Sequence, residues 1–167
     1  MSPRRVRSRQ PGGQGGFTLI ELMVTVAIIG VIALVAMPGM QTLINASRID
    51  GATSELASAF QLARSEAVRR NARVTICGSS DGATCATATT WSQVLVRQPN
   101  ATAQDPAVIR TYQPSGSMQL TGPSAGVVFR PSGLIESQQT VDVALSGNYR
   151  CITVKVSGVV SVAKGAC

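Results

Sequence analysis

An uncharged apolar run from Leu22 to Met37 constrains the fold of this 167-residue chain more than any other feature. With its flanks, from Phe17 to Met40, the run is roughly 24 residues long, and a helix needs about 20 to cross the apolar core of a bilayer. Glu21 directly precedes the run, and a charged side chain inside a bilayer costs roughly 2.5 to 3.5 kcal/mol on insertion scales. The sequence therefore predicts a transmembrane helix over residues 17–40 whose carboxyl group needs a partner.

Positive charge lies on the N-terminal side of this run. It comes from Arg4, Arg5, Arg7 and Arg9. Because positive charge keeps its side of a membrane helix in the cytoplasm, we expect a cytoplasmic N-terminus and an exported C-terminal domain. Loss of a leader that ends at Gly16 would take the net charge from +7 to about +3, so the remaining chain is only mildly basic.

Two ordinary explanations of the apolar run are a secretory signal peptide and a plain membrane anchor. A signal peptide ends in an A-x-A-like cleavage site, and the stretch Leu34-Val35-Ala36-Met37-Pro38 offers none that is convincing. A plain anchor fits the length of the run but leaves Glu21 without a partner. Neither explanation gives a role to the junction between Gly16 and Phe17.

The segment GFTLIELMVTVAIIG, residues 16–30, resembles the class III signal of type IV pilins and type II secretion pseudopilins. The resemblance implies that a prepilin peptidase removes residues 1–16 and methylates the new amino terminus at Phe17. It also implies that Glu21 meets the amino terminus of a neighbouring pilin or pseudopilin, and a buried carboxylate facing a cation is far less costly than a lone one. The expected location is the bacterial inner membrane, with a periplasmic domain, and then the pilus or pseudopilus.

Beyond the apolar run the helix is predicted to continue as an amphipathic half over residues 41–72. Pro38 and Gly39 should kink or loosen it, since proline removes a backbone donor. Apolar residues then recur at steps of three and four, which places them on one face of a helix. They are Ile49, Ala52, Leu56, Ala59, Phe60, Ala63 and Ala67. Glu66 and Arg70 form a favourable i,i+4 pair. This half should dock on a sheet.

Residues 73–167 form short β-prone runs separated by Gly, Pro, Ser and Asn, the residues typical of turns. The predicted strands cover residues 73–77, 91–97, 108–112, 127–130, 141–145, 150–156 and 159–163. Ser157-Gly158 lies between the last two and predicts a tight hairpin turn. The fold class is therefore α+β and pilin-like, with one long N-terminal helix packed on an exported antiparallel β domain.

All four cysteines lie on the exported side of the predicted span. Cys77 and Cys85 bracket a short loop, and Cys151 and Cys167 bracket the final hairpin. Four cysteines can form disulfides in three different pairings. We favour Cys77 with Cys85 and Cys151 with Cys167, because each of these disulfides closes a segment that already turns back. A zinc site is the alternative, but the spacings are irregular and the chain has no histidine. An oxidising compartment follows.

The loop Gly78-Ser79-Ser80-Asp81-Gly82 matches the G-x-S-x-G pattern of a nucleophile elbow. A serine nucleophile needs a base, yet histidine is absent and no S-x-x-K spacing supports Lys155 or Lys164. A turn explains the loop better. Scattered acids show no paired spacing for acid–base chemistry or cation binding. These are Asp81, Asp105, Glu136 and Asp142. We expect no enzyme, metal or cofactor.

Further segments resemble the GspH/FimT branch of pilin-like proteins. They are residues 62–71, residues 74–82 and residues 128–133, VFRPSG. The resemblance implies a minor pilin or H pseudopilin that helps to start or cap a filament, and the cysteine-bracketed loop favours the pilin. Some FimT-like pilins bind DNA through arginines in the last hairpin. Here only Arg150, Lys155 and Lys164 lie nearby, too few for a strong grip on phosphates, so DNA uptake is the alternative function.

Overall fold

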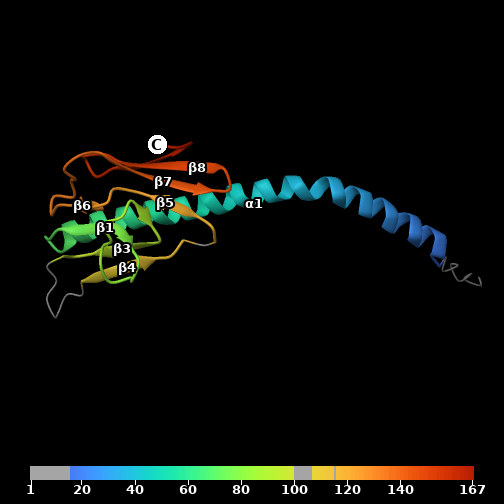
Figure 1. Cartoon of the computed structure of the whole chain (residues 1–167), viewed down its shortest axis with the longest axis horizontal. Helices are drawn as coiled ribbons and strands as arrows, with labels where there is room; N and C mark the ends of the chain where they lie inside the picture. Colours follow the sequence, from blue (N-terminus) through green and yellow to red (C-terminus); the bar gives the residue numbers. More distant parts are fainter. Residues whose placement is uncertain (1–15, 100–106, 115) are drawn as a thin grey trace, which may run out of the picture. The chain divides into compact units, whose positions relative to one another are not determined.

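The computed structural model describes residues 16–99, 107–114 and 116–167, and the side chains of all of these except 35–39. Apart from Gly16, the predicted leader of residues 1–16 lies outside the described residues. The chain divides into two compact units, Met1–Met40 and Gln41–Cys167. Figure 1 shows the helix α1 and the strands of the β-rich C-terminal unit.

The helix α1 extends over Leu19–Arg69 and supplies the core of the C-terminal unit. Six of its seven predicted stripe residues are buried, and Ala52 is half-buried. The helix ends because Asn71 adopts a left-handed conformation with φ of 49°, while the Ala72 and Asn71 amides donate to the carbonyls of Ala67 and Val68. This arrangement is a Schellman motif, in which asparagine replaces the usual glycine. Pro38 and Gly39 lie within the bounds of α1, and the kink expected at these residues stays a prediction.

Nine strands follow the helix and form two antiparallel sheets. They are β1 (Val74–Ser79), β2 (Thr90–Trp91), β3 (Gln93–Arg97), β4 (Val108–Tyr112), β5 (Gln119–Thr121), β6 (Val127–Phe129), β7 (Gln139–Leu145), β8 (Asn148–Val154) and β9 (Val160–Lys164). The first sheet has the order β4-β3-β1-β6 and the second the order β2-β5-β7-β8-β9. In Figure 1, β7 and β8 lie on one side of the C-terminal half of α1, and β3 and β4 lie on the other.

Two details of the sequence prediction are corrected. The run predicted as one strand from Trp91 to Arg97 is broken at Ser92, so that β2 pairs with β5 in one sheet and β3 pairs with β1 in the other. The short strand β5 was not predicted, because turn residues surround it and Leu120 is its one buried side chain. A single run of apolar residues cannot reveal a change of sheet, since pairing partners lie far along the chain.

Trp91 fills the space between the two sheets. It is 2% exposed, and its indole ring lies so close to Gly78 and Gly122 that a Cβ atom on either glycine would overlap it. Gly78 is on β1 and Gly122 follows β5, so the two glycines make room for one large side chain. The indole Nε1 has no hydrogen-bond partner among the described residues. The aromatic ring, rather than its polar edge, therefore joins the sheets.

Candidate functional site

The first candidate site is the start of α1, where Thr18 acts as the N-cap. The backbone N–H of Glu21 donates to the Thr18 Oγ1 at 3.3 Å. Thr18 and Glu21 have the T-x-x-E spacing of a capping box, and a carboxylate in the first turn also interacts favourably with the helix dipole. Glu21 is exposed, and Phe17 is 79% exposed. The sequence thus gives Glu21 a favourable place within its own helix and leaves its carboxyl group open to a partner.

Apolar side chains are exposed along the first turns of α1. Leu19, Ile29 and Leu34, for example, are 78%, 64% and 77% exposed. Within the parts of the chain that the structure describes, no helix combines the length and apolar character needed to cross a membrane. Exposed apolar surface of this extent marks a site of interaction with another apolar surface.

The loop that matches the nucleophile elbow is a closed turn. Cys77 and Cys85 form a disulfide across it, and the Asp81 carboxylate accepts hydrogen bonds from the Ala83 and Thr84 amides and from the Ser79 hydroxyl at 2.8 to 2.9 Å. These bonds, led by the Thr84 amide, hold the pKa of Asp81 well below its usual range. The loop leaves a strand and enters no helix, so it lacks the setting of a catalytic serine.

The second disulfide joins Cys151 on β8 to Cys167. Both disulfides are the local pairs favoured from the sequence. The Cys167 amide also donates to the Asp142 carboxylate at 2.6 Å, and Asp142 on β7 pairs in register with Cys151. The C-terminal residue is therefore held against the neighbouring strands β7 and β8 of the second sheet. In the described ranges, no group of three or more histidine, cysteine, aspartate or glutamate side chains is arranged to hold a metal ion.

The three residues considered for DNA contact do not form one cationic surface. Arg150 is 9% exposed, and its Nε donates to the Asp50 carboxylate of α1 at 2.7 Å. Its hydrogen bond to that carboxylate lowers the pKa of Asp50. Lys164 pairs in register with Arg150, whereas Lys155 lies at the opposite, turn end of the β8–β9 hairpin. Arg150 thus links β8 to α1 and is buried from solvent.

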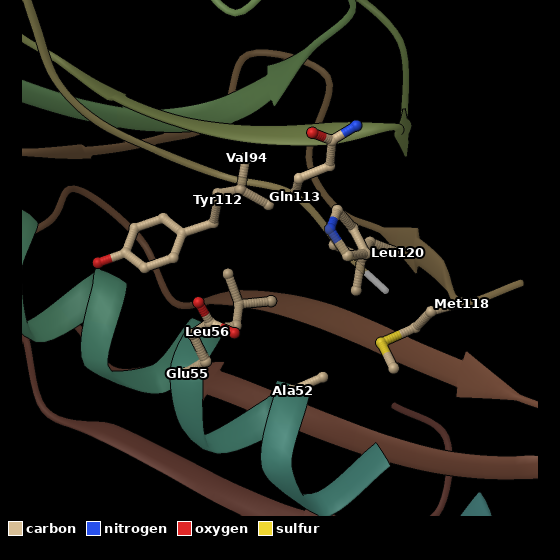
Figure 2. A pocket seen from close by; sticks show the side chains of 9 residues that line it. Ala52, Glu55, Leu56, Val94, Tyr112, Gln113, Met118 and Leu120 are labelled. Atoms are coloured by element: carbon tan, nitrogen blue, oxygen red, sulfur yellow. The ribbon is translucent and has the colours of Figure 1, made fainter. Parts of the chain in front are cut away.

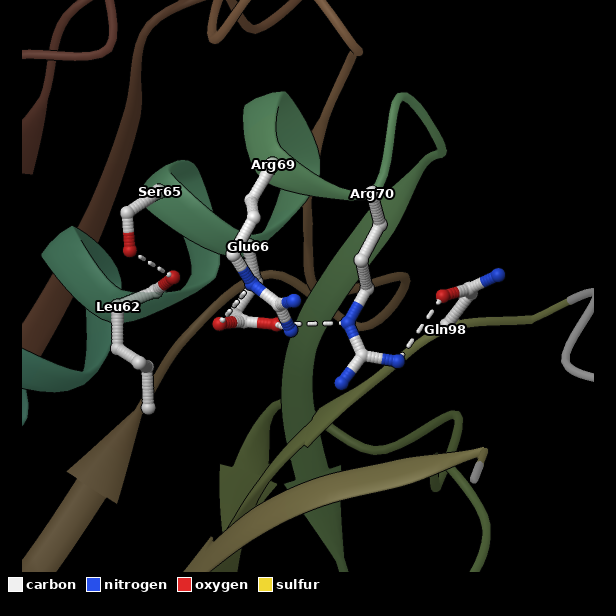
Figure 3. A network of polar contacts seen from close by, with 6 residues as sticks. All are labelled: Leu62, Ser65, Glu66, Arg69, Arg70 and Gln98. Carbon is white, nitrogen blue, oxygen red and sulfur yellow. Dashed lines mark hydrogen bonds and ion pairs between the residues drawn. The ribbon is translucent and has the colours of Figure 1, made fainter. Parts of the chain in front are cut away.

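A polar network at the end of α1 extends the predicted pair of Glu66 and Arg70. Glu66 binds Arg70 at 2.6 Å and also Arg69 at 2.6 Å, and Arg70 reaches Gln98 after β3 at 3.4 Å (Figure 3). Hydrogen bonds from Arg69 and then Arg70 lower the pKa of Glu66 to about 2. The i,i+4 spacing predicted the contact between Glu66 and Arg70. Arg70 and Gln98 are 28 residues apart, so no local pattern in the sequence predicted their contact.

Comparisons with known proteins give two family matches. Residues 52–159 match the family described as type II transport protein GspH, and residues 12–37 match the prokaryotic N-terminal methylation motif. A type IV major fimbrial protein FimA of Dichelobacter nodosus is 35% identical over 98 residues, which is 56% of this chain and 57% of FimA. The type IV major alpha-pilin of Moraxella bovis is 49% identical over 45 residues, covering 27% and 28% of the two chains. The match thus spans less than two thirds of either relative.

Solved structures show the same fold. The type IV minor pilin FimU of Pseudomonas aeruginosa has a TM-score of 0.56 at 19% identity, over 70% of this chain and 89% of FimU. The minor pseudopilin EpsH from the type 2 secretion system of Vibrio cholerae has a TM-score of 0.52 at 12% identity, over 70% and 97%. The long helix, the antiparallel sheets, the methylation motif and the match over residues 52–159 agree, and this chain belongs to the GspH family of pilin-like proteins.

Proposed function

We propose that this protein is a non-catalytic minor subunit of a type IV pilus or a type II secretion pseudopilus. The main support is that residues 19–37 of the methylation motif belong to the same helix, α1, that contributes to the core of the GspH-type unit. The proposed membrane anchor and the folded unit thus share one continuous helix, as a filament subunit requires. FimU is a minor pilin and EpsH is a minor pseudopilin, and we assign a minor position to this protein too, with initiation or capping of the filament as its role.

In this proposal, a prepilin peptidase cuts between Gly16 and Phe17 and methylates Phe17. The uncharged run of residues 22–37 then holds the subunit in the bacterial inner membrane. The arginines before it remain in the cytoplasm until cleavage, and the disulfide-bonded unit faces the periplasm. Assembly moves the apolar half of α1 from lipid to neighbouring pilins or pseudopilins. Because lipid is as apolar as a protein interior, packing and polar contacts must supply the specificity.

Intact mass and N-terminal sequencing test the first step. The full chain is expressed in a host with its own prepilin peptidase and purified from membranes. We expect a product that begins at methylated Phe17. A product that keeps residues 1–16, or one cut beyond Ala36, would contradict the filament function and return the chain to a plain anchor or a secreted domain.

Glu21 is tested by comparing two substitutions that separate its two roles. Glu21→Ala removes the carboxylate that we assign to the amino terminus of a neighbour, and should reduce the amount of this protein in sheared filaments while leaving the membrane pool intact. Thr18→Ala removes the cap, at a cost of about 1 kcal/mol to the helix start, but keeps the carboxylate and should be incorporated. Normal incorporation of Glu21→Ala would refute the electrostatic role.

A further inference from the structure

The first sheet, with the order β4-β3-β1-β6, has an inner face that packs on α1 and an outer face. Val74 and Ile76 of β1 are buried in the core that α1 shares. Because side chains alternate along a strand, Thr75 belongs to the outer face. Arg97 of β3 and Val128 of β6 both pair in register with Thr75, so their side chains lie on the outer face too.

The inner face of this sheet is closed. The hollow beside it, whose walls include Leu56 of α1, Val94 of β3 and Leu120 of β5 (Figure 2), has a volume of about 30 Å³. These three side chains are at most 4% exposed. One water molecule needs a volume of about 10 to 15 Å³, so this hollow has no room for a larger group. The outer face is therefore the one open to a partner.

Arginines are concentrated on the outer face. Arg73 and Arg130 line one hollow there with Val128 and Glu136, and its volume is about 170 Å³. Arg97 lies on the same face, on the strand next to β1. We name these three arginines the arginine face. Ligand pockets begin at roughly 300 Å³, so the hollow suits one amino-acid side chain better than a cofactor.

The charge of the arginine face is poorly neutralised. Arg130 Nη2 and Glu136 Oε1 are 3.6 Å apart, and the Glu136 side chain is 86% exposed, so this pair contributes little. Among the described residues, Arg73 has no hydrogen-bond or ion-pair partner, and Nε of Arg97 is buried without one. One weakly held carboxylate therefore accompanies three guanidinium groups.

Two of these arginines also repel each other. Val74 pairs with Phe129 in the antiparallel register of β1 and β6. Arg73 precedes Val74 and Arg130 follows Phe129, so the two arginines come opposite each other, and like charges in that position destabilise a sheet. Local conflicts of this kind occur at functional sites. An anionic group in the hollow between Arg73 and Arg130 would relieve this one.

We propose that the arginine face binds an acidic segment of a neighbouring filament subunit. One aspartate or glutamate side chain enters the hollow and pairs with Arg73 and Arg130, because guanidinium groups bind carboxylates through paired hydrogen bonds. Its methylene groups pack on Val128, which is 38% exposed, and Arg97 adds positive charge beside the hollow. The inference rests on the proposed function, because it requires assembly with other subunits.

A nucleic acid is the other anionic partner to consider, and the structure favours a protein. Three arginines neutralise few phosphates, so binding to duplex DNA would be weak. The aromatic side chains of the first sheet, Phe129 and Tyr112, belong to the inner core, so the outer strand residues offer no ring on which the bases of a single strand could stack. The exposed Val128 between the arginines also fits a protein surface better than a phosphate backbone.

Photo-crosslinking in assembled filaments tests the proposal. A benzophenone amino acid replaces Val128 in the full chain, and a control chain carries it at Tyr149 of the second sheet. We expect the adduct at position 128 to map by mass spectrometry to a peptide of another filament subunit with an aspartate or glutamate at the contact. Arg73→Glu should reduce that adduct about tenfold or more, because it places like charges together. Arg48→Glu makes the same change of charge at an exposed residue of α1 and should leave it unchanged.

A charge exchange identifies the contact and controls for folding. Replacement of the mapped acid by arginine should also reduce the adduct, and its combination with Arg73→Glu should restore the adduct, which a misfolded variant could not do. Glu136→Gln should raise the adduct, because it removes the acid that competes for Arg130.

Two failures can be told apart. Only this inference is overturned if wild-type chains enter filaments but give no adduct at position 128, if the adduct survives Arg73→Glu, or if the charge exchange restores nothing. An adduct that contains nucleic acid, or a peptide without an acidic residue, has the same meaning. If wild-type chains never enter filaments, the proposed function is overturned with it.

Discussion

Replacement of Glu66 with glutamine measures the strength of the network at the end of α1. Two arginines lower the pKa of Glu66 from 4.5 to about 2, which at 1.36 kcal/mol per pH unit corresponds to about 3 kcal/mol of stability at neutral pH. The Glu66 side chain is 14% exposed, but that of Arg69 is 65% exposed, so solvent weakens one of the two pairs. We therefore expect Glu66→Gln to lower the free energy of unfolding by about 2 to 3 kcal/mol at pH 7.

The same substitution predicts a specific pH dependence. Because the pKa of Glu66 is lower in the folded state, its stabilising effect is complete above pH 4.5 and is lost as the pH falls toward 2. The difference in the free energy of unfolding between wild type and Glu66→Gln should shrink over that window, and little of its ionisation-dependent part should remain at pH 2. Other acids titrate in both proteins, so their effects cancel in the difference.

Urea unfolding followed by the fluorescence of Trp91 provides the assay. Trp91 is the single tryptophan of the chain and is buried between the sheets, so its emission reports loss of the core. Glu136→Gln is the control, because Glu136 is 86% exposed and its 3.6 Å pair with Arg130 is exposed too; it should change stability by under about 0.5 kcal/mol. A Glu66→Gln difference that stays constant from pH 7 to pH 2 would refute the reasoning.

Three further predictions concern the β-rich unit. Gly78→Ala places a methyl group against Trp91 and should destabilise the unit by about 1 to 3 kcal/mol, seen as a lower urea midpoint. Serine at both Cys151 and Cys167 opens a loop with a sequence separation of 16 and should cost about 3 kcal/mol; an unchanged midpoint would contradict this. Asp81→Asn should speed proteolytic cleavage of its loop, measured by mass spectrometry.

Local patterns in the sequence predicted the features that depend on near neighbours. The apolar stripe of α1 recurs with the period of a helix, and the core of the C-terminal unit buries it. Each disulfide closes a chain segment that already turns back, so pairing of Cys77 with Cys85 required no distant information. The sequence analysis did not identify the cap at Thr18, although its T-x-x-E spacing with Glu21 lies within four consecutive residues.

Long-range contacts decided what the sequence left open. Arg150 was considered for DNA contact because it lies near the last hairpin, where some FimT-like pilins carry DNA-binding arginines, but Asp50, 100 residues away, binds it. The missed strand β5 has three residues, too few for a period of two to stand out from its surrounding turns.

The sequence by itself determined the long helix, the pilin-like class, the methylation motif and the local disulfides. Helical periodicity, capping and short loop closure act over a few residues, and they are therefore written in consecutive positions. Only the tertiary structure decided that the strands form two sheets joined through Trp91 and that Arg150 is paired with Asp50. These features depend on which distant segments meet, because strand pairing and side-chain packing are set by contacts across the whole chain.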